Sequence, residues 1–144
     1  MFHINADERV LGYLGRALSL ELSAVQLYST QAVLVASWGL ADVAEKFRAE
    51  SKEEMGHAER IISGMLALGV APNASQLRPV SLGQTLLVLL QHDLAFERDL
   101  ISLYEAASSH CAQSGDKDSR IFFEALLSEE RAHEKDLLQW IEEL

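Results

Sequence analysis

Carboxylates and imidazoles interrupt the apolar stripes of this sequence at spacings suited to binding metal. Each half of the chain carries a Glu-x-x-His motif, preceded at the same interval in both halves by a single glutamate. Residues three apart on a helix point to the same side, so each motif could grip one ion while a glutamate bridges. The six candidate metal-binding and catalytic residues are Glu21, Glu54, His57, Glu97, Glu130 and His133.

A constant offset in residue number relates the two halves of the chain. It maps the first three candidate ligands onto the second three. It also maps Tyr28 onto Tyr104 and Phe47 onto Phe123. The sequence therefore contains a weak internal repeat that suggests an approximate two-fold relation between the two halves, centred on polar groups.

Charge balance favours a pair of divalent cations among these residues. Four ionised carboxylates in the dry middle of a helical bundle would each cost several kcal/mol if unpaired. The nearby cations Arg98 and Arg131 each lie one residue off the stripe, whereas two divalent ions would cancel four negative charges. Carboxylate and imidazole without thiolate suit iron or manganese. The alternative is that the polar residues line a solvent channel or form neutral hydrogen-bonded pairs.

The elements that position these residues read as four long amphipathic helices. Both prolines, Pro72 and Pro79, fall in the segment 69–80, which is long enough to cross the length of a bundle. Short links elsewhere make the first two helices, and the last two, antiparallel neighbours. The fold class predicted is all-α, a ferritin-like four-helix bundle with one long crossover between helices 2 and 3. Capping residues and glycines predict helices from Asn5 to about Trp38, from Leu40 or Ala41 to Gly69, from Ser81 to about Gly115, and from Asp116 almost to Leu144.

Composition narrows the class of protein. The 144 residues are 49% hydrophobic and predict a single domain over 1–144. Lys and Arg number 12 against 22 Asp and Glu, so the net charge of −10 argues against nucleic acid or anionic membrane as partner. The single cysteine, Cys111, excludes an intramolecular disulfide framework and is expected at the surface. The N-terminus lacks signal-peptide features, and no apolar run could span a membrane. We therefore expect a soluble, cytoplasmic protein.

The chain resembles the bacterioferritins over nearly its whole length. The stretch LSLELSAVQLYSTQAVLVASWGL looks like that family's first helix and turn. The stretches AESKEEMGHAERI, HDLAFERDL and LLSEERAHEKDLL look like its metal motifs. The resemblance implies iron at the same six ligands, with Glu54 and Glu130 bridging. It further implies a ferroxidase that oxidises Fe(II) with O2 or H2O2 and stores ferric iron in a protein shell.

The resemblance also assigns a cofactor role to Met55. In bacterioferritins, the matching methionines of two symmetry-related subunits hold one haem iron between them, and thioether ligation is chemically reasonable. We expect a haem, b-type or related, at a two-fold dimer interface. Because the sequence stops at Leu144, where family members continue into a fifth helix, a 12-subunit shell is favoured over 24. An electron-donor protein is a further candidate partner.

Other interpretations use the same residues. The ligands would equally serve a di-iron monooxygenase or peroxidase that acts on an organic substrate or peroxide without storing iron. A third possibility is a haem-binding or purely interacting helical protein whose metal site is silent. Glu50 and Asp93, about one turn from the ligands, either orient a histidine or line an iron path, or are ordinary polar edge residues. Aromatic packing is the favoured role of Tyr28.

Overall fold

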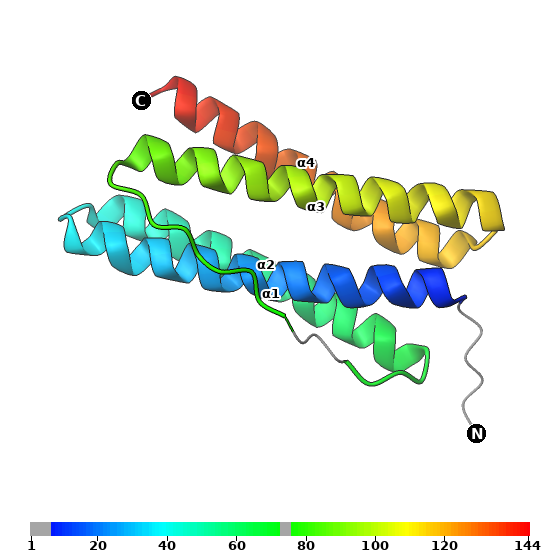
Figure 1. The fold of residues 1–144 in the computed structure, drawn as a ribbon. Helices are drawn as coiled ribbons and strands as arrows, with labels where there is room; N and C mark the ends of the chain where they lie inside the picture. The colour runs from blue at the N-terminus through cyan, green and yellow to red at the C-terminus, as the bar shows by residue number, and fades with distance from the viewer. Residues whose placement is uncertain (1–6, 73–75) are drawn as a thin grey trace. The chain divides into compact units, whose positions relative to one another are not determined.

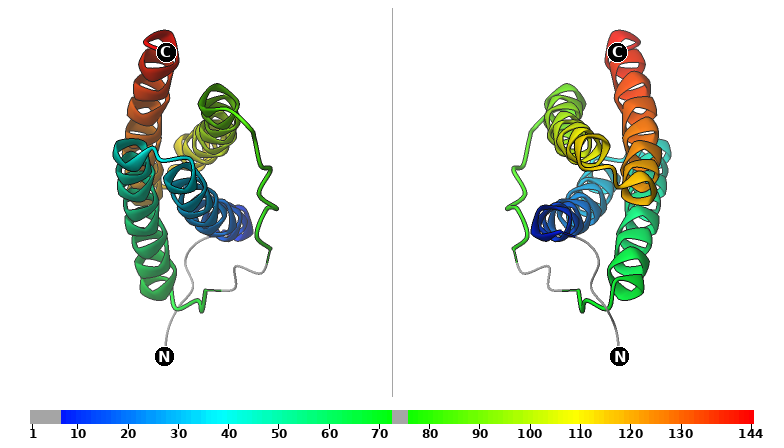
Figure 2. Two further views of the ribbon diagram at one scale, coloured as in Figure 1. Left: turned by 90° about the vertical axis from the view of Figure 1, so that its left-hand side faces the viewer. Right: turned by 90° about the vertical axis from the view of Figure 1, so that its right-hand side faces the viewer.

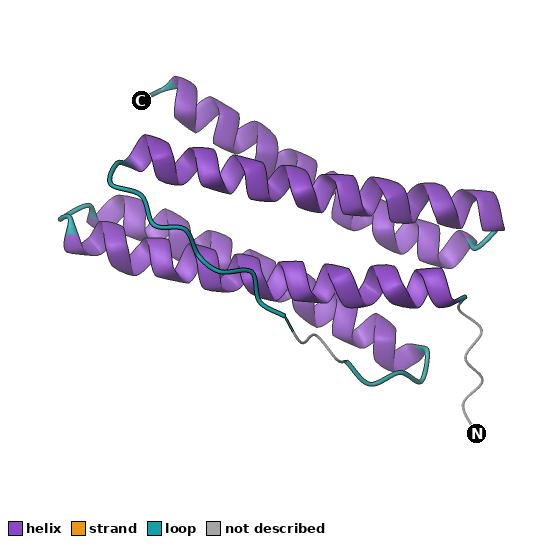
Figure 3. Ribbon diagram, in the orientation of Figure 1, coloured by secondary structure: helices purple, strands orange, loops and turns teal. Residues whose placement is uncertain are grey.

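The computed structural model describes residues 7–72 and 76–144. This part of the chain forms four α-helices and no strand, as the sequence predicts (Figure 3). None of these helices is long and apolar enough to cross a membrane. The chain divides into two compact units, Met1–Leu82 and Gly83–Leu144. The helices are α1 (Glu8–Ser37) and α2 (Ala41–Ala67) in the first unit, and α3 (Leu86–Ser114) and α4 (Lys117–Glu142) in the second.

In the first unit, α1 and α2 pack against each other as an antiparallel hairpin (Figure 1). The reversal between them contains Gly39, whose φ of +83° lies in the left-handed region that glycine adopts without strain. The cap of α1 is Asp7, whose carboxylate accepts a hydrogen bond from the backbone N–H of Val10 at 2.8 Å. Asn5, the expected cap, lies outside the described residues.

The core of the first unit contains an aromatic pair, and the later part of the crossover lies beside α1. The rings of Tyr28 and Phe47 are stacked with centroids 6.4 Å apart, and both side chains are at most 1% exposed. Residues 76–82 run beside α1 (Figures 1 and 2). The backbone N–H of Arg78 donates to the Ser23 hydroxyl at 2.8 Å, which fastens the crossover to the middle of α1.

The second unit repeats this plan with α3 and α4, which also pack as an antiparallel hairpin. Gly115, at φ +75°, ends α3, and the Asp116 carboxylate caps α4 by accepting from the N–H of Ser119 at 3.1 Å. Tyr104 and Phe123 lie with centroids 6.4 Å apart. The internal repeat of the sequence therefore corresponds to equivalent aromatic contacts in the two units.

The predicted start of α3 is wrong. The sequence favours a capping box opening at Ser81, but α3 begins at Leu86 and its cap is Thr85, whose hydroxyl accepts from Val88 N–H at 3.2 Å. Thr85 is extended, with φ −132° and ψ 155°, so the preceding residues cannot continue the helix. Gly83 folds back onto the first turn, where an added Cβ would lie 2.8 Å from a Val88 methyl.

Cys111 is buried rather than exposed, with no accessible surface. It lies about two turns after Tyr104, on the stripe of α3 that includes the buried Ala107. Since free cysteine behaves as a small apolar side chain, it fits this packing position.

Candidate metal centre

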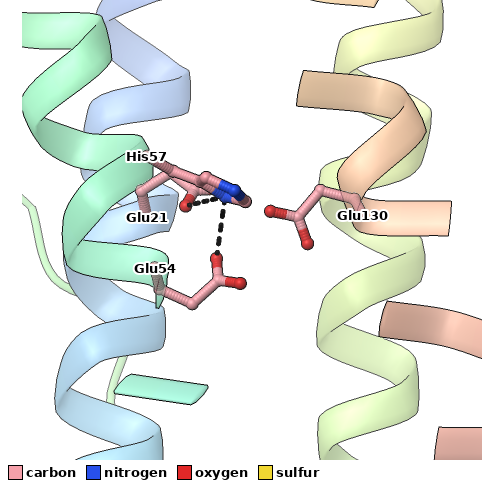
Figure 4. A group of neighbouring side chains, drawn as sticks. All are labelled: Glu21, Glu54, His57 and Glu130. Atoms are coloured by element: carbon pink, nitrogen blue, oxygen red, sulfur yellow. Dashed lines mark hydrogen bonds and ion pairs between the residues drawn. The ribbon is translucent and has the colours of Figure 1, made fainter. Parts of the chain in front are cut away.

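Three potential ligands converge in the first unit, and we call Glu21, Glu54 and His57 the first trio. Figure 4 shows the three side chains pointing toward one another from α1 and α2. His57 Nδ1 lies 3.2 Å from a Glu21 carboxylate oxygen and 3.6 Å from one of Glu54. Each residue offers a ligand atom within 4.8 Å of the others, and none is more than 3% exposed. One ion could therefore bind all three.

The second unit contains the same arrangement in Glu97, Glu130 and His133, the second trio. His133 Nδ1 lies 3.3 Å from a Glu130 carboxylate oxygen and 3.7 Å from one of Glu97. Both glutamates are fully buried and His133 is 7% exposed. In each trio the histidine contacts the glutamate of its own helix and the single glutamate of the neighbouring helix.

Helical geometry explains why these polar groups are buried. Glu21 continues the stripe of α1 that carries the buried Leu14, Leu18 and Tyr28, because residues three or four apart share a helix face. Glu54 and His57 occupy the corresponding stripe of α2, between the buried residues Phe47 and Ile61. Packing the apolar stripe therefore buries the polar interruption with it.

Nearby arginines direct their charges away from the second trio. Arg98 follows Glu97 in the chain, but its guanidinium pairs with Glu134 at 2.9 Å and its side chain is 56% exposed. Arg131 follows Glu130 and pairs with Glu105 at 3.4 Å, also at the surface. With ionised carboxylates and a neutral imidazole, each trio would carry two negative charges, the charge that one divalent cation cancels.

The remaining candidates fall in different environments. Met55 is 39% exposed, so it lies off the buried stripe that includes its neighbour Glu54, as its position in the helix predicts. Asp93 is fully buried and Glu50 is partly buried. The sequence reasoning missed Gln31, an amide side chain only 1% exposed on α1. Its spacing of three residues from Tyr28 could have placed it on the buried stripe.

Comparison with known proteins identifies the family. A family model described as a ferritin-like domain matches residues 11–144. Bacterioferritin from Rhodobacter capsulatus is 41% identical over 130 residues, which cover 90% of this chain and 81% of the relative. Bacterioferritin from Brucella melitensis is 34% identical with the same coverages.

Solved structures agree with the sequence relatives. The R. capsulatus bacterioferritin structure, described with a metal-free dinuclear site and a haem iron in a crystallographic special position, matches with a TM-score of 0.91 at 40% identity. The match covers 95% of this chain and 86% of that one. Bacterioferritin BfrA from Mycobacterium tuberculosis matches with a TM-score of 0.90 at 31% identity and the same coverages.

These matches establish the fold class predicted from the sequence. The protein has the ferritin-like four-helix bundle fold, with one long crossover connecting α2 to α3. Sequence identity, fold and metal-ligand motifs together lead to one assignment: the chain belongs to the bacterioferritin family.

Proposed function

We propose that this protein is a ferroxidase that oxidises Fe(II) with O2 or H2O2 and stores the ferric product in a homo-oligomeric shell. The two trios, within a single ferritin-like domain over 1–144, together form an intrasubunit di-iron site with Glu54 and Glu130 bridging. The observation that supports this most strongly is the pair of buried, equally composed trios. The solved R. capsulatus bacterioferritin, which is described with a dinuclear site, adds to it.

The substrate of the reaction is ferrous iron. Two Fe(II) ions each lose one electron, and the two electrons with two protons reduce O2 to H2O2 or H2O2 to two water molecules. The carboxylates of both trios bind the ions and offset the positive charge that increases on oxidation, while the imidazoles fix the position of each ion. Binding of the ions requires little rearrangement of these ligands, because burial already holds the side chains of each trio close together.

Iron uptake by variants tests the proposal. Glu54→Ala combined with Glu130→Ala should abolish rapid Fe(II) oxidation and mineral formation, followed by ferric absorbance and by iron content after gel filtration. Glu134→Ala is the matched control, because Glu134 lies on α4 but pairs with the surface residue Arg98. Uptake that is unchanged in the double variant would contradict the proposal. Oxidation of two ions per chain without further accumulation would favour a di-iron monooxygenase or peroxidase instead.

We propose that Met55 binds haem, b-type or related, at the interface of a two-fold dimer. The thioether is accessible, and a Cβ added at the neighbouring Gly56 would meet nothing within 4 Å, so the helix surface beside Met55 is open to a flat ligand. Methionines of two subunits would supply the axial ligands, and the haem would carry electrons to or from stored iron. The dimers would assemble into the shell, for which twelve subunits remain our proposal, and an electron-donor protein would act as a further partner.

A further inference from the structure

Two serine hydroxyls link α1 to α2 beside the first trio. The Oγ atoms of Ser29 and Ser51 lie 2.7 Å apart, and Ser51 Oγ donates to the backbone carbonyl of Val25 at 3.1 Å. Ser51 is only 9% exposed. We call these two hydrogen bonds the serine link.

Ser51 Oγ takes part in both hydrogen bonds of the serine link. It donates to the Val25 carbonyl, and in its 2.7 Å contact with Ser29 Oγ either hydroxyl can be the donor. When Ser51 gives its single proton to Val25, Ser29 is the donor in that contact. Removing the Ser51 hydroxyl therefore breaks both hydrogen bonds, whereas removing that of Ser29 breaks one.

The serine link lies about one helical turn from both glutamates of the first trio. Ser51 precedes Glu54 by three residues on α2, and Val25 follows Glu21 by four residues on α1. The attraction between apolar side chains is non-directional, whereas a hydrogen bond weakens steeply with distance and angle. The hydrogen bonds from Ser51 on α2 to groups on α1 therefore add a sharper constraint on helix register to the one that apolar packing supplies.

The second trio has no such link at the corresponding positions. The internal repeat maps Ser29 onto Glu105 and Ser51 onto Leu127. Glu105 instead forms a surface ion pair with Arg131, in which both side chains are about half exposed, and Leu127 packs as an apolar residue, 7% exposed. The second hairpin has its own interhelical hydrogen bond, from Ser108 Oγ to Glu124 at 3.2 Å, but these residues lie six or more positions from the glutamates of the second trio. A hydroxyl link within one helical turn of the ligands therefore distinguishes the first trio.

We propose that Ser51, supported by Ser29, is a positioning residue that fixes the register of α2 against α1 and so presets the first trio for a divalent ion. This inference rests on the proposed function, since it assumes that the trio binds metal. It predicts unequal effects on the two ions bound per chain. Because Glu54 is the one ligand of the first trio that would bridge to the second ion, loss of the serine link should weaken binding of the first ion more than binding of the second.

Anaerobic titration with Co2+, followed by its visible absorption bands, tests the proposal without iron oxidation. Ser51→Ala should raise the dissociation constant of one of the two bound ions about tenfold. This is the effect expected for two lost hydrogen bonds with partial compensation. Ser29→Ala should raise the dissociation constant of the same ion about fivefold, the effect expected for one lost hydrogen bond. Ser51→Thr keeps the hydroxyl and should restore binding. Ser37→Ala is the matched control, because Ser37 donates only within its own helix.

Wild-type affinity for both ions in Ser51→Ala would overturn the proposal. An equal loss of affinity for both ions would also overturn it, because that result indicates a general loss of packing. If Ser51→Ala does not fold, Ser29→Ala decides between the same outcomes. The wild-type titration separates this inference from the proposed function. A wild-type protein that binds no Co2+ refutes the metal site itself, whereas two ions in the wild type and no selective loss in the variants refute only the positioning role.

Discussion

Removing divalent metal should lower the melting temperature of this protein by about 10–20 °C. Each buried trio holds two carboxylates whose repulsion and desolvation a bound ion offsets. An ion present at about 100 times its dissociation constant stabilises the folded state by about 2.7 kcal/mol per site. Two sites give about 5 kcal/mol, and for a chain of this size about 1 kcal/mol corresponds to about 2–4 °C.

Differential scanning calorimetry at one fixed protein concentration measures this shift. The metal-free sample is prepared by chelation and dialysis, then compared with the same sample after addition of Co2+ or anaerobic Fe2+. A melting temperature of the metal-free protein no lower than that of the loaded protein would refute the charge-balance reasoning, since buried acids would then be stable without cations.

A charge-removing variant provides the control. Glu54→Gln with Glu130→Gln keeps side-chain volume but removes two buried negative charges. The metal-free variant should melt at a higher temperature than metal-free wild type, because less like-charge repulsion remains, and added metal should shift it less. A variant that responds to metal as the wild type does would show that these carboxylates are not ligands.

Three further predictions concern the haem and the fold. Met55→Leu should abolish the Soret band while Fe(II) oxidation stays measurable, and an unchanged Soret band would refute haem ligation by Met55. Thr85→Ala should cost about 1 kcal/mol in chemical denaturation through loss of the α3 cap, whereas Ser81→Ala should stay within about 0.5 kcal/mol; equal losses would contradict the observed helix start. Phe47→Ala should cost about 3–5 kcal/mol, because its fully buried ring stacks on Tyr28, and a smaller loss in the same assay would argue against this packing.

Helix-level features of the protein were predictable because they depend on local geometry. The Glu-x-x-His motifs place both side chains on one helix face wherever the helix lies, so the burial of these side chains follows from their spacing and from the apolar stripe they interrupt. Gly39 and Gly115 end helices by adopting positive φ, which is a property of the residue itself. The haem ligand, the subunit number and the reaction came from family resemblance and remain proposals.

Features that depend on contacts between segments distant in the sequence were decided by tertiary structure. The N-terminus of α3 could not be placed from capping signals, because Ser81 and Thr85 both offer a hydroxyl. The folded chain selects Thr85, whose backbone is extended, and brings Gly83 close to Val88. Cys111 is buried because its helix face packs in the second unit.

The serine link is the clearest case. Ser29 and Ser51 are 22 residues apart on different helices, and each alone is an unremarkable polar residue. The sequence by itself determined which residues share a helix face and which chemistry they can perform, because the periodicity of an α-helix is the same wherever the helix lies. Only the packed hairpin determined which faces meet and in what register, because that depends on side-chain fit between segments distant in the chain.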